Sequence, residues 1–374
     1  MKYFAFICIL LCVSSCQAED VKDDDINTID GINIWNYPIT DGSDSTDPLR
    51  TILMCKLLGF SYQWEDYTPF LQNPEDGPKS VVPNYTCSET EKNHLQSECL
   101  KHNNTHNSLV NLIDDKIEIA LTARGLSRDE VAYANEKGVE IIEKPIAIDA
   151  LTFIINHQNP INSLSIEQIQ GIYTGQYTNW KELGGHDVII TPYVRNRNSG
   201  SQEKFETMVM NGLNIADVPE LQIGTTMISP YYQIEGDPTG ISFTPFYYYS
   251  VIIGDGKTKG IGVNGVPMTK ENISNGSYPL IGNVYAVVRA DIDKTSMAYK
   301  LFEFITTKSG QKIVEESGYV PLSKGNETSV RAVSCSPEAP YTRRKLYNLS
   351  GIRVENTLLN KLIICNGKKY LIRK

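Results

Sequence analysis

The feature that most constrains the fold of this chain is a repeated pattern in which an apolar run leads through a polar turn into a helical segment. It occurs at residues 32–58, 117–130 and 188–213. In each segment, strand-like hydrophobic residues are followed by Ser, Thr, Asp or Gly, and then by apolar residues at helical spacing. Strands and helices that alternate in this way favour an α/β fold with a mostly parallel sheet, whose ligands bind at the carboxyl edge of the strands.

The most informative copy of this pattern is the third. We expect Val188–Thr191 to form a buried strand and residues 205–213 to form a helix. The turn between them holds the motif Ser199, Gly200 and Ser201. The first N–H groups of a helix have no intrahelical partner and carry partial positive charge, so this turn is typical of an oxyanion site. Arg195 adds a charged donor and should face water when no anion is bound; the alternative is an ordinary capping serine beside a solvated arginine.

A family resemblance adds to this interpretation. The segment 165–185 (SIEQIQGIYTGQYTNWKELGG), together with Arg195 and Ser199-Gly200-Ser201, resembles phosphate-binding proteins of ABC transporters, which belong to the type 2 periplasmic-binding-protein superfamily. The likeness is greatest to PstS-like substrate-binding lipoproteins of Bacteroidetes and Firmicutes. The resemblance implies two α/β lobes joined by two hinge strands, with the ligand in the cleft between them. It places lobe 1 at residues 34–149 and 286–325, and lobe 2 at residues 150–285.

The resemblance also assigns ligand roles to two other polar helix starts. The segment 41–49 (DGSDSTDPL) matches a glycine-containing ligand loop of the family, which carries over to Thr46 and Ser45. A second ligand loop of the family places Thr105 in the site, whereas His106 beside it is at least equally a capping or packing histidine. One position departs from the family: Ala123 stands where phosphate-specific members have an aspartate that accepts a hydrogen bond from protonated phosphate. We therefore expect phosphate to be poorly discriminated from sulfate.

Composition excludes some functions. A net charge of −9 argues against binding to nucleic acid or to an anionic membrane surface. The chain lacks a paired metal-ligand cluster, a Gly-x-Ser-x-Gly motif and a supported Cys–His pair, so we expect no enzyme activity, no cofactor and no metal. The resulting hypothesis is a monomeric receptor that captures phosphate or a similar oxyanion for an ABC-transporter permease. The alternative is a surface lipoprotein that keeps the fold for sensing or interaction, without transport.

The two ends of the chain suggest export. Residues 1–16 combine Lys2, a short apolar run and Val-Ser-Ser-Cys, a pattern typical of a lipoprotein signal peptide in which Cys16 is lipidated. Residues 17–33 form an acidic tether. These features predict a lipid anchor in the cell envelope, on the periplasmic side or at the outer-membrane surface. Residues 340–374 form a β-rich tail with an Asn-Gly hairpin turn, and this tail resembles the sorting segments of type IX secretion.

Residues 59–103 match the resembled family poorly, and we interpret them as an irregular surface insertion. A disulfide between Cys87 and Cys99 is conceivable in an oxidising compartment, as is one between Cys335 and Cys365. The spacing of these cysteines does not decide whether either bond forms.

Overall fold

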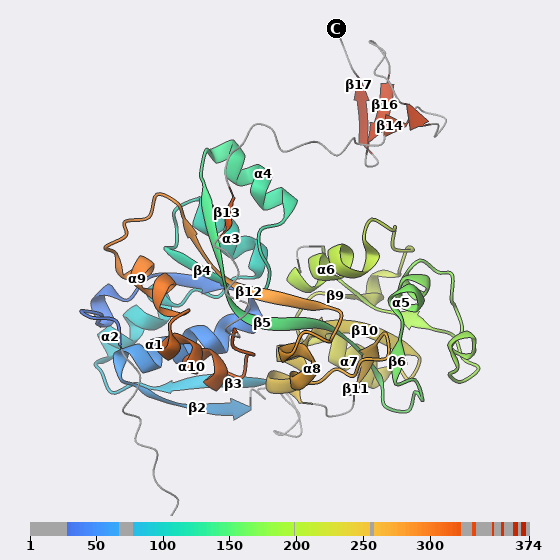
Figure 1. Cartoon of the computed structure of the whole chain (residues 1–374), viewed down its shortest axis with the longest axis horizontal. Helices are drawn as coiled ribbons and strands as arrows, with labels where there is room; N and C mark the ends of the chain where they lie inside the picture. The colour runs from blue at the N-terminus through green and yellow to red at the C-terminus, as the bar shows by residue number, and fades with distance from the viewer. Residues whose placement is uncertain are drawn as a thin grey trace, which may run out of the picture.

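One long strand organises the body of the protein. The computed structural model describes residues 28–66, 78–197, 199–254 and 258–322, together with short strands beyond residue 330. β5 (Ile141–Asn156) crosses the middle of the molecule (Figure 1). Its residues 141–150 pair with β12 (Ile281–Arg289), and its residues 151–156 pair with β10 (Gly240–Pro245) and β11 (Thr258–Val263). β5 therefore belongs to two halves of the molecule.

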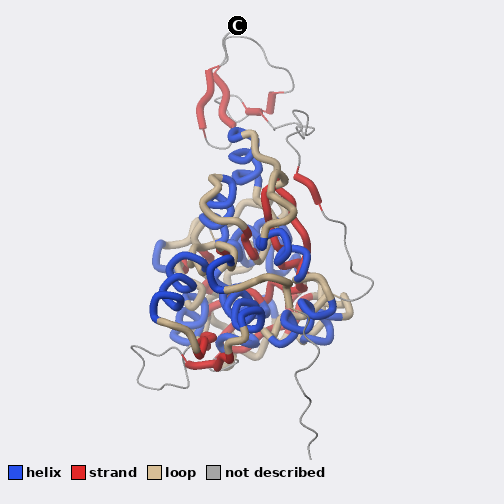
Figure 2. Tube along the Cα trace, turned by 90° about the vertical axis from the view of Figure 1, so that its left-hand side faces the viewer, coloured by secondary structure: helices blue, strands red, loops and turns tan. Residues whose placement is uncertain are grey.

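The first half contains β1 (Thr40–Gly42) and β4 (Ile119–Thr122), which complete the strand order β1-β4-β12-β5. α1 has Pro48 in its first turn, where the missing N–H breaks no helical hydrogen bond, and it ends at Gly59, whose φ is +79°. The helices of this half are α1 (Asp47–Leu58), α3 (Thr105–Ile113), α4 (Arg128–Lys137), α9 (Met297–Phe304) and α10 (Lys308–Glu316). Helices lie around the strands of the body (Figure 2).

The second half adds two short parallel partners, β7 (Thr191–Pro192) beside β10 and β6 (Ser163–Leu164) beside β11. A separate parallel pair joins β8 (Val194–Arg195) to β9 (Ile223–Gly224). The helical segments of this half are α5 (Ile166–Tyr173), α6 (Gly200–Lys204), α7 (Ser229–Gly236) and α8 (Lys270–Ser274), with the π-helical segments η6 (Phe205–Met210) and η8 (Tyr248–Ile253).

The predicted α/β class is confirmed, but the sheet is mixed rather than mostly parallel. β1 is parallel to β4, whereas β12 is antiparallel to both β4 and β5. The reason is that the chain passes from the first half to the second along β5 and returns along β12. Two neighbouring strands that cross the same boundary in opposite directions are necessarily antiparallel.

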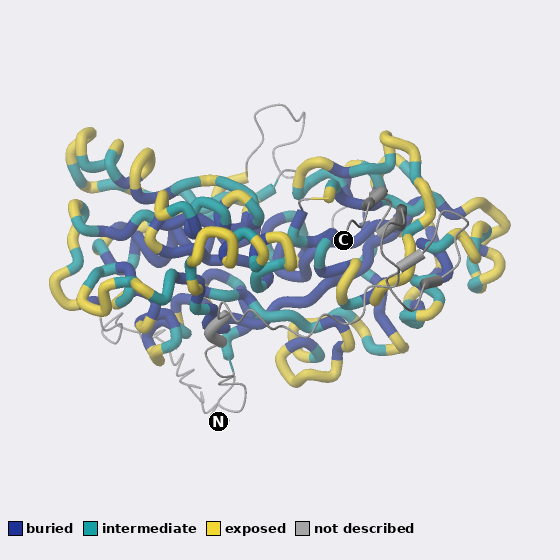
Figure 3. The backbone as a smooth tube through the Cα atoms, turned by 90° about the horizontal axis from the view of Figure 1, so that it is seen from above, coloured by how far each residue is buried: buried dark blue, intermediate teal, exposed yellow. Residues whose placement is uncertain are grey.

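Two large apolar clusters meet along β5, and the one around α1 also takes in Ile154, Tyr231 and Tyr247 of the second half. β5 supplies Ile146 and Ala147 to the core that packs against α1, and it supplies Phe153 and Ile155 to the core of the second half. The rings of Phe205 and Phe243 stack in this second core with 4.4 Å between centroids. Buried residues run along the middle of the elongated body, and exposed residues lie at its periphery (Figure 3).

The interpretation of residues 59–103 as an irregular insertion is wrong. β2 (Ser61–Asp66) and β3 (Lys79–Asn84) form an antiparallel ribbon, followed by α2 (Glu89–His94) and the π-helical segment η4 (Leu95–Cys99). Leu95 is buried in the core beside α1, so the helical part of this segment packs against the body of the protein. Cys87 and Cys99 are free thiols, so the conceivable bond between them is absent. Cys335 lies outside the described residues.

The predicted buried strand at Val188–Thr191 is also wrong. Val188 and Ile189 are 40% and 68% exposed, and β7 begins only at Thr191. Their backbone pairs instead with the preceding turn, because the N–H of Trp180 donates to the carbonyl oxygen of Val188 at 2.9 Å. The segment thus closes a surface turn before the chain enters the sheet.

The described residues beyond position 330 form short strands. β13 (Arg331–Val333) pairs with β5, and four strands form a separate antiparallel sheet in which β16 and β17 are neighbours, as the hairpin pattern predicts. These four are β14 (Leu346–Tyr347), β15 (Arg353–Val354), β16 (Leu362–Cys365) and β17 (Lys368–Leu371). The leader with Cys16 lies outside the described residues. Within those residues, every helix is too short or too polar to cross a bilayer.

Candidate anion-binding site

A small polar pocket lies where helix starts and loops of the two halves meet. Its volume is about 60 Å³, room for a few water-sized groups and hence for a small oxyanion. Of the seven residues predicted as ligands, Thr46 does not line it and the other six do. The lining residues are Ser43, Asp44, Ser45, Asn104, Thr105, Ala123, Arg195, Asn196, Ser199, Gly200, Ser201, Lys204, Thr225, Met227 and Pro245.

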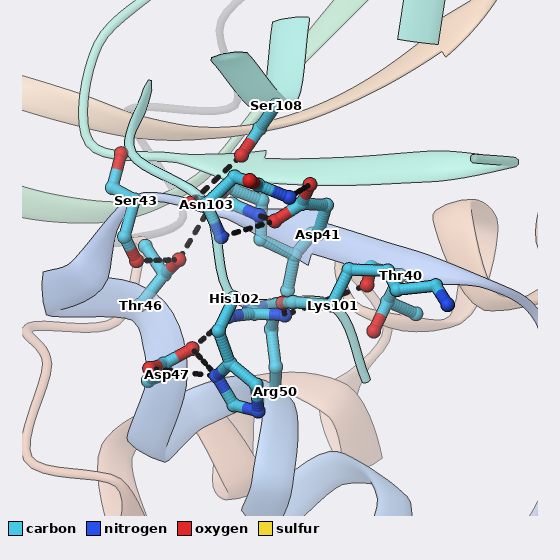
Figure 4. Close-up of polar contacts among 12 residues, drawn as sticks. Thr40, Asp41, Ser43, Thr46, Asp47, Arg50, Lys101, His102, Asn103 and Ser108 are labelled. Atoms are coloured by element: carbon cyan, nitrogen blue, oxygen red, sulfur yellow. Dashed lines mark hydrogen bonds and ion pairs between the residues drawn. The ribbon is translucent and has the colours of Figure 1, made fainter. Parts of the chain in front are cut away.

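The first-half side of the pocket, which we term the loop wall, consists of Ser43–Ser45, Asn104–Thr105 and Ala123. Hydrogen bonds join its two loops (Figure 4). One carboxylate oxygen of Asp41 accepts the N–H of Asn103 at 3.1 Å, and the other accepts its side-chain amide at 2.8 Å. The hydroxyl of Ser108 donates to the carbonyl oxygen of Gly42 at 2.9 Å. The two loops are therefore held as one unit before any ligand binds.

Hydroxyl groups on the loop wall bond mainly to each other and to the backbone. Ser43 Oγ lies 2.7 Å from Thr105 Oγ1 and accepts the N–H of Ala123 at 2.9 Å. Thr46 Oγ1 lies 2.8 Å from the carbonyl oxygen of Ser43 and 2.7 Å from that of Leu121. Because the single proton of this hydroxyl is directed to carbonyl groups, Thr46 holds the loop in place and does not present a donor to the pocket.

The second-half side, which we term the helix wall, consists of Arg195, Asn196, Ser199–Ser201 and Lys204. Ser199 stands at the N-cap position of α6 but makes no capping hydrogen bond through its side chain. α6 continues as η6, and the first N–H groups of this helix start lack intrahelical acceptors. Ser199 Oγ is buried with no hydrogen-bond partner in the described part of the chain. A Cβ atom at Gly200 would lie 2.9 Å from Thr105 Oγ1, so glycine allows the two walls to approach each other closely.

Arg195 differs from the expectation that it faces water, because it is only 5% exposed. Its Nε donates to the carbonyl oxygen of Gly224 at 3.1 Å, and one terminal nitrogen lies 3.3 Å from the sulfur of Met227. Burial lowers the pKa of Arg195, and the negative charge of Asp44 opposes this effect. The guanidinium is thus fixed in position by β9 and its following loop.

Asp44 is an acidic lining residue that sequence reasoning missed. It keeps an exposed surface, yet the surrounding protein raises its pKa by desolvation, while the charge of Arg195 opposes that rise. Its position between Ser43 and Ser45, in a segment already assigned to the site, could have indicated that Asp44 lines the pocket. The pocket therefore contains a carboxyl group. It comes from Asp44, and not from position 123, where phosphate-specific members of the resembled family have an aspartate.

Arg124 and His106 lie behind the loop wall. Arg124 makes two hydrogen bonds to the buried carboxylate of Glu130, at 2.7 and 2.8 Å, and His106 Nδ1 lies 3.0 Å from the same group. Burial alone would raise the pKa of Glu130, but the bonds and charge of Arg124 outweigh it and the pKa is lowered. Both basic residues line a neighbouring cavity of about 970 Å³ instead of the pocket, which favours the packing interpretation of His106.

Lys204 and Asp149 form a buried pair that sequence reasoning also missed. Lys204 lines the pocket, and its Nζ lies 3.8 Å from Asp149 Oδ2. The only signal was that Lys204 follows Gly200 by one helical turn. Among the described residues, no group of three or more His, Cys, Asp and Glu side chains could hold a metal ion.

Two α/β halves that share a crossing strand, with a polar pocket between their facing loops, define a type 2 periplasmic-binding fold. The chain belongs to the PBP superfamily domain family, whose profile matches residues 79–309. The match includes Thr105 and the whole helix wall. The match begins after residues 43–45, so these residues are assigned to the site from the structure alone.

Two of the three curated relatives described below carry names that specify a ligand. The phosphate-binding protein PstS of Borreliella burgdorferi is 29% identical over 222 residues, which cover 57% of this chain and 76% of that protein. Protein SphX of Synechococcus elongatus is 28% identical over 220 residues, covering 55% of this chain and 64% of that protein. PstS of Bacillus subtilis is 25% identical over 196 residues, covering 51% and 62%. The chain thus spans just under two thirds of the last two.

Solved structures show the same fold. A putative phosphate ABC transporter substrate-binding protein from Clostridium perfringens, solved with bound phosphate, aligns with a TM-score of 0.54 at 23% identity, covering 76% of this chain and 99% of that one. An ABC-type phosphate transport receptor from Vibrio cholerae aligns with a TM-score of 0.52 at 20% identity, covering 76% and 100%.

Proposed function

We propose that this protein is an extracytoplasmic receptor that binds phosphate or a related small oxyanion and delivers it to the permease of an ABC transporter. The observation that carries the proposal is the convergence of six predicted residues, from three separate segments, on one small pocket that contains the buried cation Arg195. The phosphate-binding names of its relatives support the choice of ligand. In this role the protein holds and releases its ligand and catalyses no reaction.

Titration calorimetry on the protein without its leader tests the proposal. Phosphate should bind, and sulfate should be rejected poorly, because Ala123 offers no acceptor for the proton that distinguishes phosphate. A strong preference for phosphate would instead assign the acceptor role to Asp44, which lines the same pocket. If phosphate, sulfate and simple phosphate esters all give neither heat nor a thermal shift, the receptor hypothesis fails. A surface module for sensing or interaction, which keeps the fold without transport, then takes its place.

The receptor role includes closure of two lobes, with lobe 1 at residues 34–149 and 286–325 and lobe 2 at residues 150–285. The change of partner strands along β5 supports a hinge near residues 149–150, since β12 pairs with the residues up to 150 and β10 with those from 151. In small-angle X-ray scattering, the radius of gyration should fall when phosphate is added. An unchanged radius despite measurable binding would contradict closure.

The receptor would be a monomer in the cell envelope, lipid-anchored through Cys16 on the periplasmic side or at the outer-membrane surface. The short apolar run and the Val-Ser-Ser-Cys junction support this anchor. Mass spectrometry of the mature protein should find acylated Cys16 at the N-terminus; a soluble species that begins elsewhere would refute it. Residues 340–374 resemble a sorting segment of type IX secretion, which would be redundant beside a lipid anchor.

A further inference from the structure

Lys204 has hydrogen-bonding capacity that the protein itself does not use. It is the last residue of α6, it lines the pocket, and its side chain is only 6% exposed. Its Nζ makes no hydrogen bond within the part of the chain that the structure describes. The contact with Asp149 Oδ2, at 3.8 Å, is longer than the roughly 3.2 Å limit of an N–H···O hydrogen bond. A buried ammonium group thus keeps its donors unpaired beside a candidate anion pocket.

Asp149 is the partner that holds this charge. Its Oδ1 accepts the N–H of Tyr247 at 3.0 Å, whereas its Oδ2 has no hydrogen bond among the described residues. It lies on β5 opposite Gly282, one residue before the end of the pairing with β12. A buried charge without hydrogen bonds is unfavourable, so an acceptor that enters the pocket and reaches Lys204 would lower the free energy.

The electrostatics of the pair agree with this geometry. Burial lowers the pKa of Lys204, and Asp149 opposes this effect, while nearby Arg124 lowers the pKa further. Burial raises the pKa of Asp149, and Lys204 opposes that rise. In each case burial disfavours the charged form. A bound anion would favour the ammonium form of Lys204, as it favours the guanidinium of Arg195.

We propose that Lys204 is a second cationic ligand of the oxyanion and that Asp149 competes with the anion for its ammonium group. The inference rests on the proposed function and deepens it, because it identifies a second cation that contributes to affinity and a carboxylate that opposes it. Arg195 is fixed by β9 and Met227, whereas Lys204 can exchange one anionic partner for another. Binding would then weaken the contact between α6 and β5 at the strand boundary between the two halves.

Titration of the leaderless protein with inorganic phosphate at neutral pH tests the inference through changes of opposite sign. Lys204→Met should weaken binding about tenfold to a hundredfold, since a charge-assisted donor is lost. Asp149→Asn should tighten binding about threefold to tenfold, because the amide can still accept the N–H of Tyr247 but no longer attracts Lys204. The double variant should bind like Lys204→Met, and it leaves no unpaired buried carboxylate that could disturb the fold.

Lys259→Met is the matched control. Lys259 lies in the same half, but its Nζ donates to the carbonyl oxygen of Asn159 at 2.7 Å, and it does not line the pocket. Its loss should leave the phosphate affinity unchanged. The inference is overturned if Lys204→Met binds like the wild type, or if Asp149→Asn weakens binding instead of tightening it, as a purely structural pair would. A wild type that binds neither phosphate nor sulfate refutes the proposed function, and this inference with it.

Discussion

The loop wall and the helix wall of the pocket satisfy their polar groups in opposite ways. On the loop wall, Ser43 and Thr105 bond to each other, and Ser43 also accepts a backbone N–H. On the helix wall, three buried lining atoms have no hydrogen-bond partner in the described chain: Asn196 Oδ1, Ser199 Oγ and Lys204 Nζ.

The difference indicates that the two walls have different roles. The buried carboxylate of Glu130 stabilises the loop wall on the side away from the pocket. It contacts His106 and Arg124, which are the chain neighbours of the wall residues Thr105 and Ala123. A wall with few unpaired groups can keep its shape without ligand. The helix wall carries polar groups whose burial is unfavourable until an anion meets them. Changes to the loop wall should therefore act mainly on stability, and changes to the helix wall mainly on affinity.

The largest expected effect is on stability, from Glu130→Gln. Removing one partner of a buried ion pair costs about 3–5 kcal/mol of unfolding free energy, because Arg124 is left without a counter-charge. The lowered pKa of Glu130 gives the pH dependence: its stabilisation is complete above the ordinary value of 4.5 and is lost as pH falls through the lowered value of the folded state.

Urea unfolding at stepped pH measures this effect. The stability gap between wild type and variant should be constant near neutral pH and should shrink below about pH 4. A gap that does not change down to about pH 3 would mean that the charge of Glu130 does not hold the loop wall.

The next largest effect is on affinity, from Arg195→Ala. Loss of a charge-assisted donor should weaken phosphate binding about tenfold to a hundredfold in calorimetry. Since Arg195 is buried, we also expect a loss of about 1–3 kcal/mol in stability, unlike for a solvated arginine. Arg197→Ala is the control, because Arg197 lines the neighbouring cavity, and it should change neither quantity. Equal losses of affinity in both variants would remove Arg195 from the site.

The smallest effects give the sharpest contrast, between one serine of each wall. Ser43→Ala should reduce stability by about 1–3 kcal/mol, because the buried N–H of Ala123 loses its acceptor. Ser199→Ala should change stability by less than about 0.5 kcal/mol, since its hydroxyl has no partner to lose, but should reduce phosphate affinity about fivefold to tenfold. Denaturant unfolding measures the stability of both variants, and calorimetry measures their phosphate affinity. A loss of affinity in Ser43→Ala and a loss of stability in Ser199→Ala would contradict the assigned roles of the two walls.

Sequence reasoning found much of the site because helix starts are local. Ser199, Gly200 and Ser201 are adjacent, and the turn, the cap and the free N–H groups all follow from their spacing. Thr105 and Ser45 were found through family resemblance, and both line the pocket. The α/β class followed from the alternation of strand and helix patterns.

What sequence reasoning missed depends on contacts between distant segments. Thr46 resembles a ligand residue, but its hydroxyl is directed to Leu121, which lies on another strand. The burial of Arg195 depends on Gly224 and Met227, and the role of Lys204 depends on Asp149 of β5. No local pattern encodes these pairings, so a buried lysine at the pocket looked like an ordinary helix-surface residue.

The length of β5 has a consequence for how the molecule melts. Because this one strand supplies side chains to both apolar cores, unfolding either half would leave part of β5 unpaired and its apolar residues in water. The free energy of each half therefore depends on the other. We expect the body to unfold in a single cooperative transition, with one peak in scanning calorimetry. Two separated peaks would show that one half can unfold while the other half keeps its part of β5 folded.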